Sequence, residues 1–158
     1  MEFIEEQGEG YLAHVMGRLY DRFLRAFEEW YPEFGVVAPA RTHSTMHALH
    51  EYGSLGVTEI ASLIRQSHPL VIKWVRELTT LGLVTSSADP QDARRTILRL
   101  TEAGQRDFES QQAARVVTGR AFRSLSKEVG AEDLFDVLWR MEKTLQKEPF
   151  AERLRRLS

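Results

Sequence analysis

The stretch that decides the fold is SHPLVIKWVRELTTLGLVTSSADPQDARRTILRLTEAG, residues 67–104. It predicts a helix over 67–81, a short strand, a tight charged turn, a second strand and the start of another helix. This order is typical of a helix-turn-helix unit followed by a β-hairpin wing. The turn of the hairpin is cationic because it ends in Arg94 and Arg95.

The predicted helix over 67–81 has a buried face and an outward face. Apolar side chains at helical spacing predict the buried face, and these are Val71, Trp74, Val75 and Leu78. Ser67 suits the N-cap, and Gly82 is a typical residue just beyond a helix end. On the far side of the hairpin, Thr101 is placed to cap the next helix.

Such a unit favours DNA as its partner, because a helix of this size fits the major groove and an arginine suits a narrow minor groove. Lys73 and Arg76 suit guanine edges or phosphates, and the helix N-terminus at Ser67 suits a phosphate. The predicted DNA-contacting residues are Ser67, His68, Pro69, Ile72, Lys73, Arg76, Asp92, Arg94 and Arg95. The alternatives are an N-cap alone for Ser67, an ordinary exposed helix face, and a solvated turn.

The distribution of charge agrees with this reading. The whole chain has a net charge of −2, but residues 65–106 hold seven Lys/Arg against four Asp/Glu, a net charge of +3. Residues 1–51 hold four Lys/Arg against nine Asp/Glu. The positive excess therefore coincides with the predicted DNA reader.

Composition excludes several other classes of protein. The 158 residues include no cysteine, which excludes disulfides, thiolate metal sites and a cysteine nucleophile. No apolar run approaches the ~18–20 residues of a membrane span, and the acidic N-terminus does not resemble a secretion signal. We therefore expect a cytoplasmic protein without membrane contact.

The flanking segments predict long amphipathic helices. Residues 10–30, 101–125 and 131–146 carry apolar stripes wider than one lone helix needs, and the tail from residue 151 reads as polar and frayed. The expected fold is mainly α with a small β-hairpin wing (α+β), a single domain over 1–158. Residues 39–104 form the winged helix-turn-helix, and residues 1–38 and 105–158 supply dimerisation helices. A two-fold dimer would bury the stripes and present two reading helices to a pseudo-palindrome.

Other functions find less support. No nucleophile elbow, zinc-protease, phosphate-binding or dinucleotide motif is present, so we expect no catalytic residues, no cofactor and no metal. His43 and His47 lie one helical turn apart and His50 follows, but surface histidines or a polar pocket lining are the simpler reading. For a small-molecule effector, the candidate contacts are Arg18, Tyr20, His47 and Trp74, with a core role as the alternative for Trp74.

Five segments together resemble the MarR family of winged helix regulators: residues 53–61, 67–71, 78–84, 89–95 and 100–104. The combination of Gly-Leu-Val before the wing, Asp-x-Arg-Arg within it and Leu-Thr-x-x-Gly after it carries the resemblance. It implies a homodimer that binds an operator and is released by a small ligand, commonly an aromatic acid. The chain departs from the family pattern at Ile72, where a hydroxyl residue is common, and at Thr85, where an arginine is common soon after Gly-Leu-Val. A protein-interaction module on the same scaffold is the alternative function.

Overall fold

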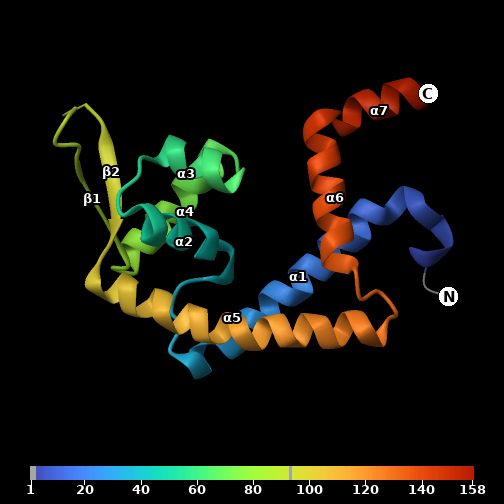
Figure 1. Ribbon diagram of the computed structural model, residues 1–158, viewed down its shortest axis with the longest axis horizontal. Coiled ribbons are helices and arrows are strands. Elements are labelled where there is room, and N and C mark those ends of the chain that lie inside the picture. Colours follow the sequence, from blue (N-terminus) through green and yellow to red (C-terminus); the bar gives the residue numbers. More distant parts are fainter. Residues whose placement is uncertain (1–2, 93) are drawn as a thin grey trace. The chain divides into compact units, whose positions relative to one another are not determined.

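The computed structural model describes residues 3–92 and 94–158, and it is mainly helical with one two-stranded antiparallel sheet (Figure 1). The first helices are the short 3-10 helix η1 (Glu5–Tyr11) and the long α1 (Leu12–Trp30). The 3-10 helices η2 (Tyr31–Phe34) and η3 (Ala40–Thr42) lead into the central unit. The remaining elements are α2 (His43–Tyr52), α3 (Val57–Ile64), α4 (His68–Thr80), β1 (Val84–Ala88), β2 (Thr96–Leu100), α5 (Glu102–Glu128), α6 (Leu134–Lys147) and α7 (Phe150–Leu157).

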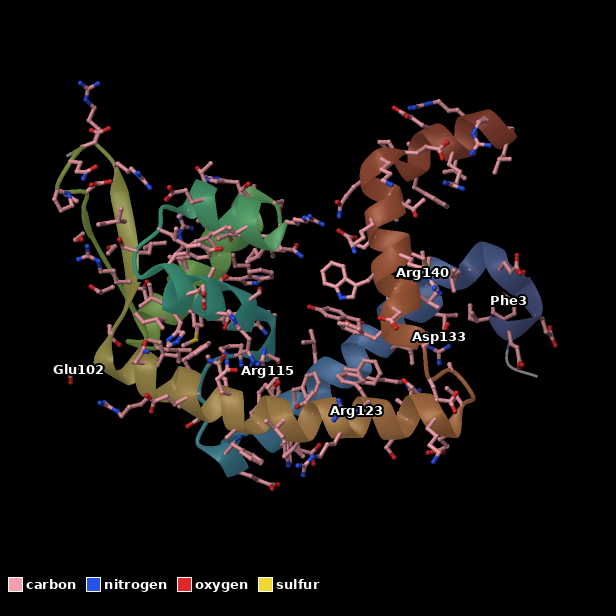
Figure 2. The ribbon with its side chains drawn as sticks, viewed as in Figure 1. Phe3, Glu102, Arg115, Arg123, Asp133 and Arg140 are labelled. Carbon is pink, nitrogen blue, oxygen red and sulfur yellow. The ribbon has the colours of Figure 1, made fainter. Side chains whose placement is uncertain are left out.

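The chain divides into two compact units, Met1–Ala114 and Arg115–Ser158, and the division falls within α5. In Figure 2, Glu102 marks the start of α5, and Arg115 marks the first residue after the division. The first unit contains the complete helix-turn-helix and its hairpin. The second contains the end of α5 together with α6 and α7.

The core of the first unit lies between α2, α3, α4 and the hairpin, which Figure 1 draws beside one another. Met46, Leu49 and Ile60 are at most 1% exposed and form its centre. The buried face predicted for the helix over 67–81, which is α4 in the structure, is confirmed, because Val71, Trp74, Val75 and Leu78 all lie in this core. Burial of this face fixes which residues of α4 point outward.

The hairpin predicted over 84–100 is present, with Val84 paired to Leu100 and Ala88 paired to Thr96. It is joined to the helices through its second strand, because the backbones of Leu55 and Leu98 exchange hydrogen bonds of 3.2 and 2.9 Å. Leu98 is also buried in the core. The base of the wing is therefore anchored on the segment that precedes α3.

The residues predicted to end α4 and begin α5 meet at one point. Gly82 follows α4 with a φ of +71°, the left-handed conformation that glycine favours. Thr101 Oγ1 accepts the backbone N–H of Gly104 at 3.0 Å and donates to the carbonyl of Gly82 at 2.7 Å. The predicted cap at Thr101 is confirmed, and it ties α5 to the end of the reading helix.

One sequence expectation about local structure is confirmed in position only, and another is wrong. Ser67 occupies the N-cap position of α4, but its hydroxyl makes no capping hydrogen bond. The polar tail is helical, since α7 spans Phe150–Leu157. Glu148 stabilises α7 by accepting hydrogen bonds from Arg153 at 2.8 Å and from Arg156 at 3.0 Å. The polar composition of the tail does not reveal these ion pairs, and for this reason the sequence predicts a frayed tail.

No helix within residues 3–92 and 94–158 combines the length and the hydropathy that crossing a membrane would require.

Candidate nucleic-acid interface

The outward face of α4 carries two exposed cations. Lys73 and Arg76 are exposed on the side opposite the buried face, and Ile72 beside them is half-buried. In the part of the chain that the structure describes, neither cation has a hydrogen-bond or ion-pair partner for its side chain. Ser67, His68 and Pro69 are exposed at the N-terminal end of the same helix, where its positive dipole end points outward.

The turn of the wing is closed by aspartate side chains that bind backbone N–H groups. Asp89 accepts the N–H of Gln91 at 2.9 Å, and Asp92 accepts the N–H of Arg94 at 3.0 Å. The backbone of Asp89 also donates to the carbonyl of Arg95 at 2.8 Å. Asp92 therefore shapes the turn through its bond to the backbone of Arg94. Ala93, part of the predicted turn, lies outside the described residues.

The two arginines of the wing have different surroundings. Arg95 forms ion pairs with Glu59 at the start of α3 and with Asp89 in the hairpin, the second at 3.4 Å. Arg94 is exposed, and its side chain has no such partner among residues 3–92 and 94–158. Arg95 is therefore engaged in ion pairs within the protein, whereas the side chain of Arg94 is accessible to a ligand.

Glu59 joins the wing to the helix-turn-helix by accepting hydrogen bonds from both. Its carboxylate accepts the backbone N–H of Gly56 at 2.7 Å, which caps α3, and it also accepts a hydrogen bond from Arg95. The bond to the Gly56 backbone and the guanidinium of Arg95 lower the pKa of Glu59 below its ordinary value. Glu59 is therefore ionised whenever the pH is near neutral, and the connection to Arg95 is present.

The three histidines of α2 pack within the first unit. The Nε2–H of His43 donates a hydrogen bond of 3.1 Å to the carbonyl of Ala38, and the ring stacks on Tyr31 at 4.9 Å between ring centroids. His47 and His50 contact the ring of Phe108 in α5, edge-on at 5.5 Å and stacked at 4.0 Å. Burial lowers the pKa of His43 below 6.5. Within the described residues, no three His, Cys, Asp or Glu side chains are grouped so that they could hold a metal ion.

The structure places the four residues considered for an effector on three helices, α1, α2 and α4. Trp74 is 6% exposed and belongs to the core, the alternative that its helical spacing favoured. Arg18 and Tyr20 lie on α1, and His47 lies on the exposed side of α2. A pocket of about 210 Å³ lies elsewhere, lined by Glu28, Tyr31, Pro32 and residues 36–41.

Sequence reasoning missed several residues that organise the site. Glu59 had a detectable signal, since a glycine followed three residues later by glutamate before an apolar run is a variant of the capping box. Arg41, Glu77 and Asp107 had none, because their partners lie 13 to 70 residues away in the sequence.

The fold defines a winged helix-turn-helix protein, with exposed cations on α4 and at the tip of its wing. Comparison with known proteins makes this more specific. The model of the MarR family matches residues 40–96, which span η3 to the first residue of β2. No curated protein matches the chain.

Three solved structures illustrate the structural similarity. A probable transcriptional regulator from Pseudomonas aeruginosa is 25% identical, with a TM-score of 0.68 over 82% of this chain and 96% of that one. PcaV from Streptomyces coelicolor, in complex with its natural ligand, is 21% identical, with a TM-score of 0.67 over 86% and 92%. A mutant of MarR from E. coli, complexed with operator DNA, is 16% identical, with a TM-score of 0.67 over 92% and 99%.

Over residues 40–96 the chain matches the MarR family, and its fold is similar to that of MarR over most of its length. Regulators of this family are generally non-enzymatic DNA-binding proteins.

Proposed function

We propose that the protein is a homodimeric, DNA-binding transcription regulator that reads a pseudo-palindromic operator. In this function α4 enters the major groove and the hairpin β1–β2 reaches the adjacent minor groove. The observation that carries the proposal is a set of exposed cations whose side chains have no partner within residues 3–92 and 94–158. They are Lys73 and Arg76 on the outward face of α4, and Arg94 at the tip of the wing. Ser67, His68 and Pro69 complete the surface at the start of α4, with Ile72 able to meet a thymine methyl group.

The two wing arginines have separate roles in this proposal. Arg94 enters the minor groove, whose narrow A/T tracts concentrate negative potential. Arg95 holds the wing against the start of α3 through Glu59, so that the tip is presented at a fixed height above the reading helix. Asp92 supports Arg94 through the backbone of the turn.

Dimerisation is the second part of the proposal. Exposed apolar side chains cover one stripe of α6 and part of α1, among them Leu138 at 41%, Trp139 at 46% and Leu19 at 46%. Exposed apolar stripes on this scale favour burial against a second copy. In a two-fold dimer the reading helices would stand ~34–36 Å apart, the spacing of successive major grooves on one face of DNA.

Release by a small molecule is the third part, and it is the extension to this chain of what PcaV's complex with its natural ligand illustrates. The pocket lined by Glu28, Tyr31, Pro32 and residues 36–41 is the candidate site for such an effector, in preference to the surfaces around Arg18, Tyr20, His47 and Trp74. An effector would act by favouring a dimer in which the reading helices no longer match the groove spacing.

The direct test is DNA affinity, measured by fluorescence anisotropy on DNA from upstream of the protein's own gene and on scrambled DNA. We expect selective binding with a steep loss of affinity between about 50 and 200 mM salt. Arg94→Ala should weaken operator binding by roughly tenfold or more and reduce the salt slope by about one unit, because one phosphate-proximal cation is lost.

A matched control is Arg155→Ala, which removes the same charge from α7, outside the proposed interface. We expect its affinity to stay within about twofold of the wild type. Equal affinities for Arg94→Ala and the wild type would contradict the role of the wing. Absence of wild-type binding at low salt would favour the alternative of a protein-interaction module.

A further inference from the structure

A network of three charged side chains, which we call the Arg41 network, joins the reading helix to α1 within the first unit. Arg41 in η3 donates through Nη2 to Glu77 of α4 at 2.5 Å and through Nη1 to Glu28 of α1 at 3.2 Å. The Arg41 and Glu77 side chains are 32% and 28% exposed. Because both are largely withdrawn from water, this pair is screened less than a surface ion pair.

The backbone that carries Arg41 is held in place by α5. The Asp107 carboxylate is buried and accepts the backbone N–H groups of Val37 at 2.6 Å and Ala38 at 3.3 Å. Its second oxygen accepts a hydrogen bond from Gln111 at 2.7 Å. The hydroxyl of Thr42 donates to the carbonyl of Pro39 at 2.7 Å, which closes the turn around Arg41. Arg41 therefore projects from a segment that is held in place, so its ion pairs can restrict the positions of Glu77 and Glu28.

The negative charge of Glu77 lies close to the cations that we propose bind DNA. It follows Lys73 by one helical turn and is the neighbour of Arg76, so it lies at the edge of the outward face of α4. Its second carboxylate oxygen is buried and has no hydrogen-bond partner among the described residues. Without Arg41 this carboxylate would repel a DNA phosphate and would be free to pair with Lys73 instead.

We propose that Arg41 is a positioning residue for DNA reading, which acts through Glu77. It sets the orientation of α4 about its own axis, and thus the direction of Lys73 and Arg76, and it neutralises the acid beside them. The inference rests on the proposed function. Glu28 and Arg41 also line the pocket described above, so a molecule bound there would lie against two members of the network.

The test is a double-mutant cycle with Arg41→Gln, Glu77→Gln and the two combined, on the full chain. Operator affinity is measured by anisotropy, and hydrogen exchange of the α4 amides is measured without DNA. Arg41→Gln should weaken operator binding roughly tenfold, because Glu77 is left unpaired, and adding Glu77→Gln should recover most of that loss. Amide exchange over residues 76–80 should be faster in both single variants than in the wild type.

Two further variants separate positioning from general damage. Arg41→Lys keeps a positive charge beside Glu77 but loses the forked geometry that also reaches Glu28, so it should bind the operator more tightly than Arg41→Gln and less tightly than the wild type. Arg106→Gln removes an arginine from an exposed ion pair with Glu102 at 4.0 Å and should change neither measurement. Thermal unfolding of each variant shows that it is folded.

Two results would overturn the inference: losses that simply add in the combined variant, and an Arg41→Gln variant that matches Arg106→Gln in both measurements. If the wild type binds no DNA at low salt, the proposed function fails, and hydrogen exchange alone then decides. Faster exchange in α4 would then support only the part of the inference by which Arg41 holds α4 in place, whereas unchanged exchange would overturn that part as well.

Discussion

Arg94 and Arg95 are neighbours in the sequence, but their side chains have different surroundings in the structure. The carboxylate of Glu59 is 36 residues from Arg95 and binds it, while Arg94 remains exposed. The N-terminal cap of α3 places the Glu59 carboxylate beside the wing, and this position determines that Arg95 is the arginine that forms the ion pair. A single residue's role here depends on a partner that the local sequence does not contain.

His43 makes the stability of the protein depend on pH. Burial is the largest influence and lowers its pKa, while the hydrogen bond with Ala38 and the charge of Asp107 partly oppose this. The folded state therefore holds His43 neutral at a pH where the unfolded chain, with a pKa near 6.5, begins to take up a proton. The free energy of unfolding should fall as the pH drops below about 6.5 toward the folded-state pKa.

Urea unfolding across pH 7 to 5 checks this, with His43→Gln expected to show a flatter profile than the wild type. His14→Gln alters an exposed histidine of α1 and should keep the wild-type slope. Parallel profiles for His43→Gln and the wild type would show that His43 is not the group responsible.

At the scale of elements, the junction of α4, β1 and α5 depends on one glycine. A Cβ added to Gly104 would lie 2.0 Å from the carbonyl oxygen of Leu83, which is backbone and cannot rotate away. The same carbonyl accepts the N–H of Thr101 at 3.0 Å. The absence of a side chain at Gly104 is thus what allows α5 to begin directly against the start of the wing.

Gly104→Ala should therefore reduce the free energy of unfolding by about 1–3 kcal/mol or more, measured by chemical denaturation. Gly119→Ala is the matched control on the same helix, because its Cβ would meet only the flexible end of Arg123 at 3.6 Å. That substitution should be neutral or stabilising by about 0.5–1 kcal/mol. Similar values for the two variants would contradict the close approach at Leu83.

At the scale of the whole molecule, the chain is divided between a unit with a conventional core and a unit without fully buried residues in its two C-terminal helices. No residue of α6 or α7 is buried, although α6 has a strongly amphipathic sequence. Leu134, Leu138, Met141 and Leu145 repeat at helical spacing and are 38–42% exposed in the single chain. A stripe of this kind lacks its packing partner in the single chain, which is the physical basis of the proposed homodimer.

Leu138→Glu should therefore shift the protein from dimer to monomer, as measured by light scattering coupled to size exclusion. A buried carboxylate without a partner would oppose association. Lys143→Glu changes an exposed polar position of α6 and should remain dimeric. A wild type that is monomeric at tens of micromolar, or a Leu138→Glu variant that stays dimeric, would contradict the proposed interface.

The sequence by itself determined the features that depend on neighbours along the chain. The 3.6-residue spacing of Val71, Trp74, Val75 and Leu78, the two short strands on either side of a charged turn, and the caps at Gly82 and Thr101 are local signals, and the structure confirms them. They were sufficient for the winged helix fold and for its MarR-like motifs, which the family match over residues 40–96 supports.

Only the tertiary structure decided which charges are engaged and which are available. Arg95 is held by Glu59, Arg41 by Glu77, and Asp107 holds the backbone of residues 37 and 38, across separations of 36 to 70 residues. Side-chain ion pairs of this kind have no periodicity along the chain, since they arise where packing brings distant elements within about 4 Å of each other. The spacing of hydrophobic residues fixes the elements, and the packing of those elements fixes the partners of the charges.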